Sequence, residues 1–247
     1  MRIRENTILI TGGSAGIGLA IAKSLASSGN TVIICGRDQG RLAQAKAAVP
    51  ALHTIQCDIA KDDDLAVLQK RIESDFPRLN ILINNAAIMH IGDFGASVEG
   101  TERIEEEVCT NLLAPMKLTS LLLPLLQQQA SAAIVIVSSG LAYVPVANVA
   151  VYCATKAALH SFAHSLRYQL RGTGVKVFEL LPPLVDTNLS RTLHMPKIHA
   201  EQVAKALLRG LEREHYEVRV GMVKSLHVVS QLAPQLAERM LNKAFSS

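Results

Sequence analysis

Apolar residues gather along the chain in short runs of aliphatic and β-branched side chains, and longer stretches with helical apolar spacing lie between these runs. The first two runs are Thr7–Thr11 and Thr31–Cys35. Short apolar runs are typical of strands buried on both faces, and their alternation with helical stretches indicates a parallel sheet. Similar runs predict strands at 52–57, 80–83, 133–138, 175–181 and 217–221. We therefore expect an α/β fold, a doubly wound parallel sheet of about seven strands with helices on both faces.

The stretches between the predicted strands have apolar residues at helical intervals. They predict helices at 19–28, 38–49, 62–76, 99–129, 152–171 and 199–214, and one amphipathic helix after the last strand. In the helix at 99–129, the apolar residues after Asn111 surround nearly the whole helix. A helix of this kind is buried on both sides. We expect one side to pack on the sheet and the other to contact another subunit.

Length and composition suit one domain. The chain has 247 residues and 49% hydrophobic content, and no repeat, low-complexity tract or linker divides it. These features predict a single domain over residues 1–247 with a substantial core. The net charge of +4 comes from scattered lysines and arginines. Scattered charge indicates solubility and not a nucleic-acid surface.

Three features bear on the compartment. The four cysteines are far apart and form no Cys-x-x-Cys pair, which favours a reducing environment without disulfide or metal use. The first predicted strand begins at Thr7 and leaves no room for a signal peptide. The most apolar stretch, Leu112–Leu126, is interrupted by Pro115, Lys117 and Pro124, so we expect a buried helix and no membrane span. Together these features predict a cytoplasmic protein.

A glycine-rich turn directly follows the first predicted strand. It has the form Thr-Gly-x-x-x-Gly-x-Gly, with Gly12, Gly16 and Gly18 as its glycines, and a helical stretch comes next. Glycines allow the backbone to approach a pyrophosphate, and a helix N-terminus offers free N–H groups and the positive end of its dipole. The order of strand, turn and helix therefore predicts a dinucleotide site. A turn that serves only tight packing is the alternative.

Arg37 stands at the end of the second predicted strand, where an acidic residue would accept the ribose 2′-hydroxyl of NAD. An arginine at this position can pair with a 2′-phosphate, so we expect NADP(H) to be preferred, with NAD(H) as a possible second cofactor. Arg41 can reinforce this charge, whereas Asp38 can partly offset it. A solvated loop arginine is the alternative.

The segment from Ser139 to Lys156 carries the candidate chemistry. Ser139 comes soon after the apolar run Ile134–Val137, and Tyr152 and Lys156 are four residues apart at the start of a helical stretch. Residues four apart share a helix face, so the ammonium can lie beside the phenol. A nearby cation favours the phenolate and can lower the phenol pKa from about 10 toward neutrality, which allows proton exchange with a carbonyl or alcohol oxygen. Taken alone, this Tyr-x-x-x-Lys spacing also fits an ordinary helix surface.

With these residues laid out, the chain resembles the short-chain dehydrogenase/reductase family from the first predicted strand to the last. Its motifs occur in the family's order and at its usual intervals: Thr11-Gly12-x-x-x-Gly16-x-Gly18, Asp58, Asn84-Asn85-Ala86, Asn111, Ser139, Tyr152-x-x-x-Lys156 and Pro182-x-x-Val185-x-Thr187. The resemblance implies a Rossmann fold with strand order 3-2-1-4-5-6-7. It also implies hydride transfer between a nicotinamide cofactor and a carbonyl or alcohol. The subunits are expected to form a homodimer or homotetramer by pairing the helices that follow Asn111 and Tyr152.

The resemblance implies roles for single residues. Tyr152 would be the acid/base, Lys156 would lower its pKa and bind the nicotinamide ribose, and Ser139 would orient the carbonyl. Asn111 would position a water in the proton relay. Gly12, Ile17 and Gly18 would line the pyrophosphate turn, Asp58 and Ile59 the adenine, Asn85 the adenosine side, and Val185 with Thr187 the nicotinamide. The expected cofactor site is completed by Ser14, Gly16, Arg37, Ala86, Tyr152 and Pro182.

Two positions depart from the family pattern. Ala87 replaces the glycine that usually follows Asn-Asn-Ala, and Pro183 replaces the one that usually follows Pro182. An extra methyl group and the fixed φ of proline can reshape the pocket, but neither change touches the four catalytic residues. We therefore expect activity to be retained.

Two classes of function fit these residues. The first is an enzyme that acts on a small-molecule carbonyl or alcohol, and apolar candidate lining residues such as Met89 and Leu141 favour a hydrophobic or small compound. The second is a non-catalytic dinucleotide-binding regulator or scaffold, although a pure binder has no use for a tuned phenol. His160 and His164 have a spacing that suits a metal, but the glutamate of a metalloprotease motif is missing between them, so no metal is expected.

Overall fold

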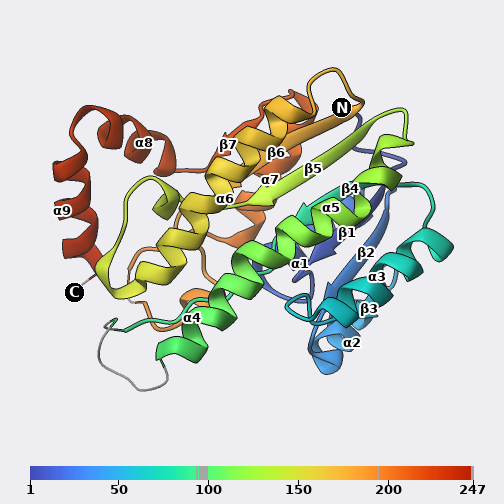
Figure 1. Cartoon of the computed structure of the whole chain (residues 1–247), viewed down its shortest axis with the longest axis horizontal. Helices are drawn as coiled ribbons and strands as arrows, with labels where there is room; N and C mark the ends of the chain where they lie inside the picture. Colours follow the sequence, from blue (N-terminus) through green and yellow to red (C-terminus); the bar gives the residue numbers. More distant parts are fainter. Residues whose placement is uncertain (93, 95–99, 194, 246–247) are drawn as a thin grey trace.

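The computed structural model describes residues 1–92, 94, 100–193 and 195–245. Within these residues, seven parallel strands form one sheet in the order β3-β2-β1-β4-β5-β6-β7 (Figure 1). The predicted fold class, strand number and strand order are therefore confirmed. The strands are β1 (Thr7–Thr11), β2 (Thr31–Gly36), β3 (His53–Gln56), β4 (Leu79–Asn84), β5 (Ala132–Val137), β6 (Val175–Leu181) and β7 (Glu217–Arg219).

The strand order reverses at β1, which pairs with β2 on one side and with β4 on the other. Ile8 of β1 lies opposite Val32 in β2 and opposite Ile81 in β4. Because all three strands are parallel, their carboxyl ends lie at the same edge of the sheet. In open parallel sheets, ligands bind in the crevice outside the carboxyl ends, at the point where the strand order reverses. The fold thus places the glycine turn after β1 beside the asparagines after β4.

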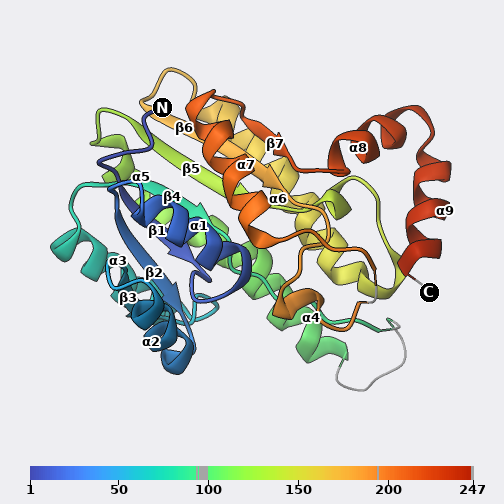
Figure 2. The same cartoon turned by 180° about the vertical axis from the view of Figure 1, so that it is seen from behind.

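One face of the sheet is covered by α1 (Gly16–Ala26), α2 (Gln39–Ala48) and α7 (Ala200–Glu212), of which α1 and α7 are seen in front in Figure 2. Ile8 and Ile10 of β1 point to this face, where they belong to one core cluster with Ile21 and Leu25 of α1. Alternate residues of a strand share a face, so the apolar run of β1 supplies both sides of the sheet.

The opposite face is covered by α3 (Asp62–Asp75), α5 (Ala114–Gln127) and α6 (Ala150–Gln169), which lie in front in Figure 1. Leu9 of β1 points to this face and joins a second core cluster with Leu118, Leu122 and Leu126 of α5. These leucines are four residues apart and therefore form one stripe along α5. Their burial against the sheet fixes the rotation of this helix about its own axis.

The long helix expected at 99–129 contains a wide turn. α4 (Gly100–Val108) leads into a π-helical turn at Cys109–Leu113, from which α5 continues. Glu99, the predicted first residue, lies outside the described residues. A π-helical turn is a rare departure from α-helical geometry that occurs frequently at functional sites. Here it holds Asn111, one of the four residues expected in catalysis.

The continuous run Gly100–Gln127 is 28 residues long, with a mean hydropathy of 1.3 over its most apolar window, so by length and composition it is able to cross a membrane. Its Leu118, Leu122 and Leu126 are instead fully buried against the sheet. We interpret this run as a core helix, as expected from the sequence.

The C-terminal part of the chain contains two helices where one was predicted. α8 (Val223–Leu232) and α9 (Pro234–Phe245) are separated at Ala233, whose φ of −146° and ψ of 67° are not helical. The cause is Pro234, because proline disfavours the helical conformation in the residue before it. Figure 1 shows both helices at one end of the molecule. The Asn242 side chain of α9 bridges the Ala147 N–H and the Pro145 carbonyl, which lie between β5 and α6.

Candidate active site

The turn between β1 and α1 has no space for side chains at its glycines. A Cβ on Gly12 would lie 2.9 Å from the Cα of Ala86, and a Cβ on Gly16 would lie 2.9 Å from the Cγ2 of Thr187. Both glycines also have positive φ angles, of 64° and 53°. A residue with a side chain is therefore excluded twice, by backbone conformation and by the close approach of the loops after β4 and β6.

The ends of β1 and β4 are held together by the Thr11 and Asn85 side chains. The Thr11 hydroxyl accepts hydrogen bonds from the backbone N–H groups of Asn85 and Ala86, at 3.0 and 3.1 Å. The Asn85 amide donates to the carbonyls of Thr11 and Gly12, at 2.9 and 3.3 Å. Asn85 therefore fixes the position of the glycine turn and also borders the site.

A cleft of about 480 Å³ runs along these turns. Most of the residues expected to bind the cofactor line it: Gly12, Ser14, Gly16, Ile17, Arg37, Asp58, Ile59, Asn85, Ala86 and Thr187. Ala87, the departure from the family pattern, lines it as well. A cleft of this size, with a glycine turn and a helix N-terminus on one wall, fits a dinucleotide.

Five of the expected cofactor residues are not among the residues that line this cleft: Gly18, Tyr152, Lys156, Pro182 and Val185. A Cβ on Gly18 would lie 2.4 Å from the carbonyl oxygen of Gly12, so this glycine allows the turn to pack against α1. The Pro182 carbonyl accepts a hydrogen bond from the Gly140 N–H at 3.1 Å, and Val185 forms a parallel bridge with Ile198. Direct roles of these residues at the cofactor stay predictions.

Arg37 lines the cleft directly after the last residue of β2. Its guanidinium is 62% exposed and pairs with Glu106 of α4 at 3.4 Å. Asp38, which was expected to offset the arginine, caps α2 by accepting a hydrogen bond from the Arg41 N–H at 3.0 Å and pairs with the Arg41 guanidinium at 3.3 Å. The carboxylate nearest Arg37 in sequence is thus engaged by its own helix and by a second arginine that also lines the cleft.

Asn111 is completely buried in the π-helical turn. Its Oδ1 accepts a hydrogen bond from the Ile88 N–H and its Nδ2 donates to the Ile88 carbonyl, both at 2.8 Å. Nδ2 also lies 3.4 Å from the Thr155 hydroxyl of α6. The side chain therefore ties the loop after β4 to two helices, and the predicted relay role of Asn111 is not tested by these contacts.

Ser139, Tyr152 and Lys156 converge at the carboxyl end of β5. Ser139 precedes a 3-10 turn at Gly140–Ala142, and its hydroxyl accepts a hydrogen bond from the Leu141 N–H at 3.1 Å. The Ser139 side chain also lowers the pKa of the Tyr152 phenol, which places the two hydroxyl groups beside one another. The Lys156 Nζ lies 5.4 Å from the centre of the Tyr152 ring and donates to the Val137 carbonyl at 2.9 Å. All three side chains are buried.

Burial dominates the electrostatics of these groups. It raises the pKa of Tyr152 above its ordinary value, and the Ser139 side chain opposes this rise. Burial lowers the pKa of Lys156 to about 8, and the negative charge of Glu179 opposes this fall. A low-dielectric environment disfavours the charged form of each group, which explains the opposite directions. The lowered Tyr152 pKa expected from the sequence is therefore absent from the protein alone.

Two buried carboxylates lie near the site and were not recognised in the sequence. Glu107 of α4 accepts a hydrogen bond from the His90 N–H at 2.9 Å, and burial raises its pKa. Glu179 lies in the middle of β6 and is 0% exposed. The available signal for Glu179 is a single carboxylate inside the apolar run 175–181. A charged residue in a buried strand is costly unless it is paired, so it indicates a specific partner.

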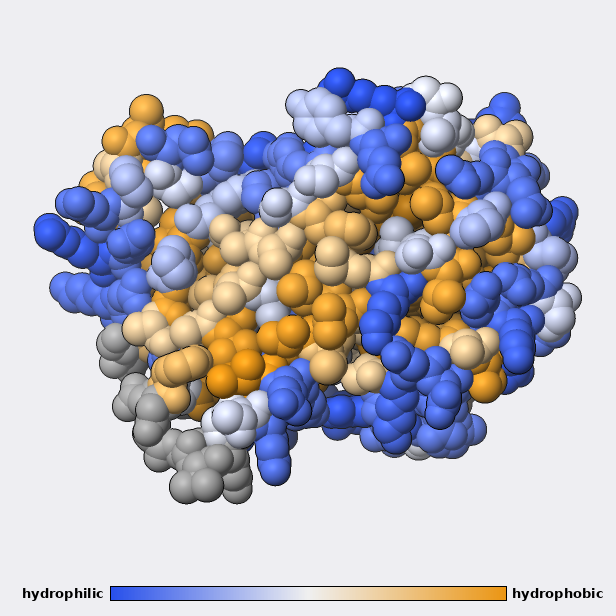
Figure 3. Space-filling view, viewed as in Figure 1, coloured by the Kyte–Doolittle hydropathy of each residue, from blue (hydrophilic) through white to orange (hydrophobic). Residues whose placement is uncertain are grey.

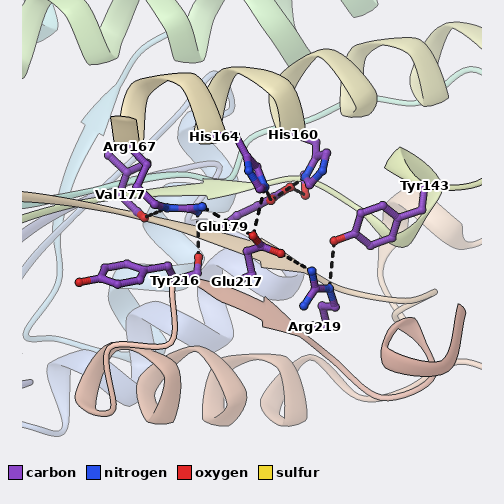
Figure 4. A network of polar contacts seen from close by, with 10 residues as sticks. Tyr143, His160, His164, Arg167, Val177, Glu179, Tyr216, Glu217 and Arg219 are labelled. Carbon is purple, nitrogen blue, oxygen red and sulfur yellow. Dashed lines mark hydrogen bonds and ion pairs between the residues drawn. The ribbon is translucent and has the colours of Figure 1, made fainter. Parts of the chain in front are cut away.

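The histidines at 160 and 164 face β6 and β7 from α6, as Figure 4 shows. His160 Nδ1 lies 2.8 Å from a Glu179 oxygen, and His164 Nε2 lies 3.2 Å from a Glu217 oxygen. The hydrogen bond with Glu179 raises the pKa of His160. Both rings are thus already paired with carboxylates, and the expected absence of a metal stays a prediction.

An apolar cluster surrounds the Tyr152 ring. Its buried members are Val146, Val149, Tyr152 and Cys153, and partly buried residues from four parts of the chain pack against them: Ala87, Met89, Leu141, Leu189, Leu241 and Phe245. Leu241 and Phe245 belong to α9, which the sequence did not connect with the site. Leu241 and Phe245 reach this cluster only because α9 packs against the segment between β5 and α6. The sequence carries no direct signal for that contact.

The fold and this site define a class: an oxidoreductase built on a dinucleotide-binding sheet. The chain matches the family described as short chain dehydrogenase over residues 6–197. It is 45% identical over 232 residues to the uncharacterized oxidoreductase DltE of Bacillus subtilis, and this alignment covers 92% of each chain. The chain belongs to the short-chain dehydrogenase/reductase family, as the sequence motifs predict.

Two solved structures extend the comparison. A short chain dehydrogenase from Burkholderia cenocepacia in complex with NADP has a TM-score of 0.87 and 25% identity, over 98% of this chain and 99% of that one. A short-chain dehydrogenase from Sphingobium yanoikuyae in complex with NADPH has a TM-score of 0.80 and 28% identity, over 95% of this chain and 93% of that one. The architecture of the present chain is thus that of its family along nearly its whole length.

Proposed function

We propose that the protein catalyses NADP(H)-dependent reduction of a carbonyl, or oxidation of the corresponding alcohol, with Tyr152 as the acid/base. The observation that carries this proposal is the arrangement of Ser139, Tyr152 and Lys156 at the carboxyl end of β5. A serine hydroxyl beside the phenol is positioned to hydrogen-bond the same substrate oxygen. The bound cofactor would supply or accept the hydride, and the protein supplies orientation and one proton.

The proton chemistry rests on the buried phenol. In reduction, Tyr152 donates its proton to the carbonyl oxygen while Ser139 holds that oxygen by a hydrogen bond. The raised pKa of Tyr152 keeps the phenol protonated, which suits this direction. In oxidation, the phenolate removes the alcohol proton, and the Lys156 ammonium and the positive charge of an oxidised nicotinamide would both favour that form. The backbone contacts of Asn111 support its position beside this relay.

A cofactor with a 2′-phosphate is supported by Arg37 and Arg41, which both line the cleft. The relatives from Burkholderia cenocepacia and Sphingobium yanoikuyae bind NADP and NADPH, which supports the same preference. The Arg37–Glu106 pair is exposed. An exposed ion pair contributes about 0–1 kcal/mol, so a phosphate competes with Glu106 for the arginine at little cost.

The Arg37→Gln variant tests this preference. A hydrogen bond to a charged group contributes about 1.5–3 kcal/mol, so NADPH binding is expected to weaken by roughly 10- to 100-fold. NADH binding is expected to change little, because it has no 2′-phosphate. Fluorescence titration with both cofactors measures this difference.

Arg71→Gln is the control, because Arg71 lies on α3 outside the cleft and has a similar ion pair with Asp75 at 3.4 Å. Equal weakening of NADPH and NADH by the Arg37 variant, or no weakening of either, would contradict the NADP preference.

The substrate is proposed to be a small or hydrophobic carbonyl compound, because the cluster around Tyr152 is largely apolar. A carbonyl panel screened for NADPH oxidation, with NADPH binding titrated in parallel, tests the function as a whole. Tight NADPH binding without turnover of any member would instead favour a non-catalytic regulator or scaffold. We also propose a cytoplasmic location, which the four unpaired cysteine thiols support.

A homodimer or homotetramer is supported by the outer surface of α5 and α6. In Figure 3 an apolar area crosses the middle of this face. Leu113 and Met116 are 40% and 36% exposed there, and Ala154 and Ala157 of α6 are exposed as well. Small and apolar residues allow two such helices to pack against their symmetry mates.

The double variant Met116→Glu and Ala157→Glu is expected to produce a 26.6 kDa monomer in sedimentation, because a two-fold contact would bring four new carboxylates together. Val67→Glu is the control, since Val67 is 63% exposed on α3. A native protein that sediments only as a monomer at micromolar concentration would contradict the proposed assembly.

A further inference from the structure

Glu179 is a carboxylate in a place where carboxylates are rare. It is 0% exposed in β6, and its strand neighbours Phe178 and Leu180 are fully buried. A buried ionised carboxylate without partners would be costly, so its surroundings are expected to satisfy it.

Both oxygens of Glu179 have partners. Ser138, the residue directly after β5, donates its hydroxyl hydrogen bond to Oε1. His160 of α6 lies 2.8 Å from Oε2 through its Nδ1. Figure 4 shows the carboxylate between the histidines of α6 and the charged residues of β7. Glu179 of β6 thus connects the end of β5 to α6.

These two partners are next to the catalytic residues in the chain. Ser138 precedes Ser139, and His160 is one helical turn after Lys156. The Lys156 ammonium in turn donates to the carbonyl of Val137, the residue before Ser138. Glu179 is therefore placed to hold the backbone segment from which Ser139 and the Lys156 acceptor both project.

The charge of Glu179 acts on Lys156 as well. Burial lowers the pKa of Lys156 to about 8, and the attraction of Glu179 is what raises it. Near pH 8 a buried lysine with this pKa loses its proton. The negative charge at Glu179 therefore favours the protonated form of Lys156 against the effect of burial.

We propose that Glu179 is a positioning residue of the active site, which holds the end of β5 through Ser138 and α6 through His160 and supports the buried Lys156 ammonium by its negative charge. This inference rests on the proposed function, because the ammonium is the group that serves the phenol and the nicotinamide ribose. It adds a residue of β6 to a site otherwise built from the loops and helices around it.

Other charged groups surround the same carboxylate. On α6 these are His160, His164 and Arg167, on β7 they are Glu217 and Arg219, and Tyr143 and His227 lie beyond them. Glu217 is paired with both arginines, whose positive charge offsets its own. Glu217 therefore provides a matched control: a carboxylate of the same cluster whose charge is offset by two arginines.

The test is the Glu179→Gln variant, which keeps the size of the side chain and removes the charge. NADPH affinity and kcat/KM for carbonyl reduction are measured from pH 6 to pH 9. If the Lys156 pKa falls from about 8 by about one unit, the protonated fraction at pH 8 falls from about a half to about a tenth. Both quantities are then expected to fall roughly fivefold at pH 8 and to change less than about twofold at pH 6.

In Glu217→Gln, NADPH affinity and kcat/KM are expected to fall at the same alkaline pH as in the native protein. An alkaline fall that does not move in Glu179→Gln, or a loss of equal size at every pH, would overturn the inference, because a merely structural role lowers activity without shifting its pH dependence. Circular dichroism checks that the variant folds. If it does not, Glu179→Met removes the charge at similar volume and is read in the same way.

The binding measurement separates this inference from the proposed function. The native protein could turn over no carbonyl and still lose NADPH affinity at alkaline pH, with this loss moved to lower pH in Glu179→Gln. That result would refute the enzyme and support the role of Glu179. The native protein could instead turn over carbonyls while the alkaline loss of NADPH affinity and of kcat/KM occurs at the same pH in Glu179→Gln. That result would support the enzyme and refute the role of Glu179.

Discussion

Replacing Tyr152 by phenylalanine is expected to lower turnover at least about a hundredfold, the lower end of what a positioned general acid contributes. The substitution removes one oxygen and keeps the ring, which packs against Val146, Val149 and Cys153. Folding and NADPH binding are therefore expected to persist. Steady-state NADPH oxidation with any accepted carbonyl, together with a binding titration, measures both effects.

Tyr168→Phe is the matched control for this prediction. Tyr168 lies on the same helix, is 62% exposed, and stacks on the Arg171 guanidinium 4.0 Å from the ring centre. Its hydroxyl is expected to have no effect on turnover. Near-native turnover in Tyr152→Phe would make Tyr152 a packing residue and would remove the main support for the proposed mechanism.

Replacing Lys156 by methionine is expected to lower turnover and also to weaken NADPH binding. In the proposed mechanism the ammonium serves both the phenol and the nicotinamide ribose, and a hydrogen bond to a charged group contributes about 1.5–3 kcal/mol. We expect roughly 10- to 100-fold losses in both measurements. The sign of the pH effect follows from the pKa of Lys156 near 8: native binding weakens above this pH, and the variant has no such limb.

The free energy of unfolding of Lys156→Met is expected to fall by about 1–3 kcal/mol, because the buried Val137 carbonyl loses its donor and the buried Glu179 carboxylate loses an attractive positive charge. Lys70→Met on the exposed side of α3 is the control. Reduced turnover with unchanged NADPH affinity would confine Lys156 to the phenol and would contradict its second role.

The strands were predictable because burial on both faces leaves a simple signal, whereas their order was predicted from the resemblance to the family. Ile8 and Ile10 of β1 pack in one core cluster and Leu9 packs in the other, so the strand is apolar on both faces. The glycine turn was predictable for a related reason, since Gly12 and Gly16 tolerate no Cβ. The division of the C-terminal helix at Ala233 was readable from Pro234, although the amphipathic pattern continues across it.

The polar contacts of Glu179 were not predictable in this way. Glu179 is 41 residues from Ser138 and 19 residues from His160 along the chain, and each of these residues alone fits several ordinary roles. The π-helical turn at Cys109–Leu113 is equally hidden, because its sequence favours an α-helix as readily. Such features depend on contacts between distant segments, which hydrophobic periodicity does not encode. The direction of the Tyr152 pKa shift is a further example, since spacing shows the cation and not the desolvation.

The bridge from Asn242 to Pro145 and Ala147 has a consequence for the order in which the protein matures on the ribosome. The two partners of this bridge are 97 and 95 residues apart in the chain. At roughly 5–20 residues per second, the segment with Tyr152 leaves the ribosome about 5–20 seconds before the helix that covers it. During that interval the apolar residues around Tyr152 are without Leu241 and Phe245, and the nascent chain presents them to chaperones or to other nascent chains.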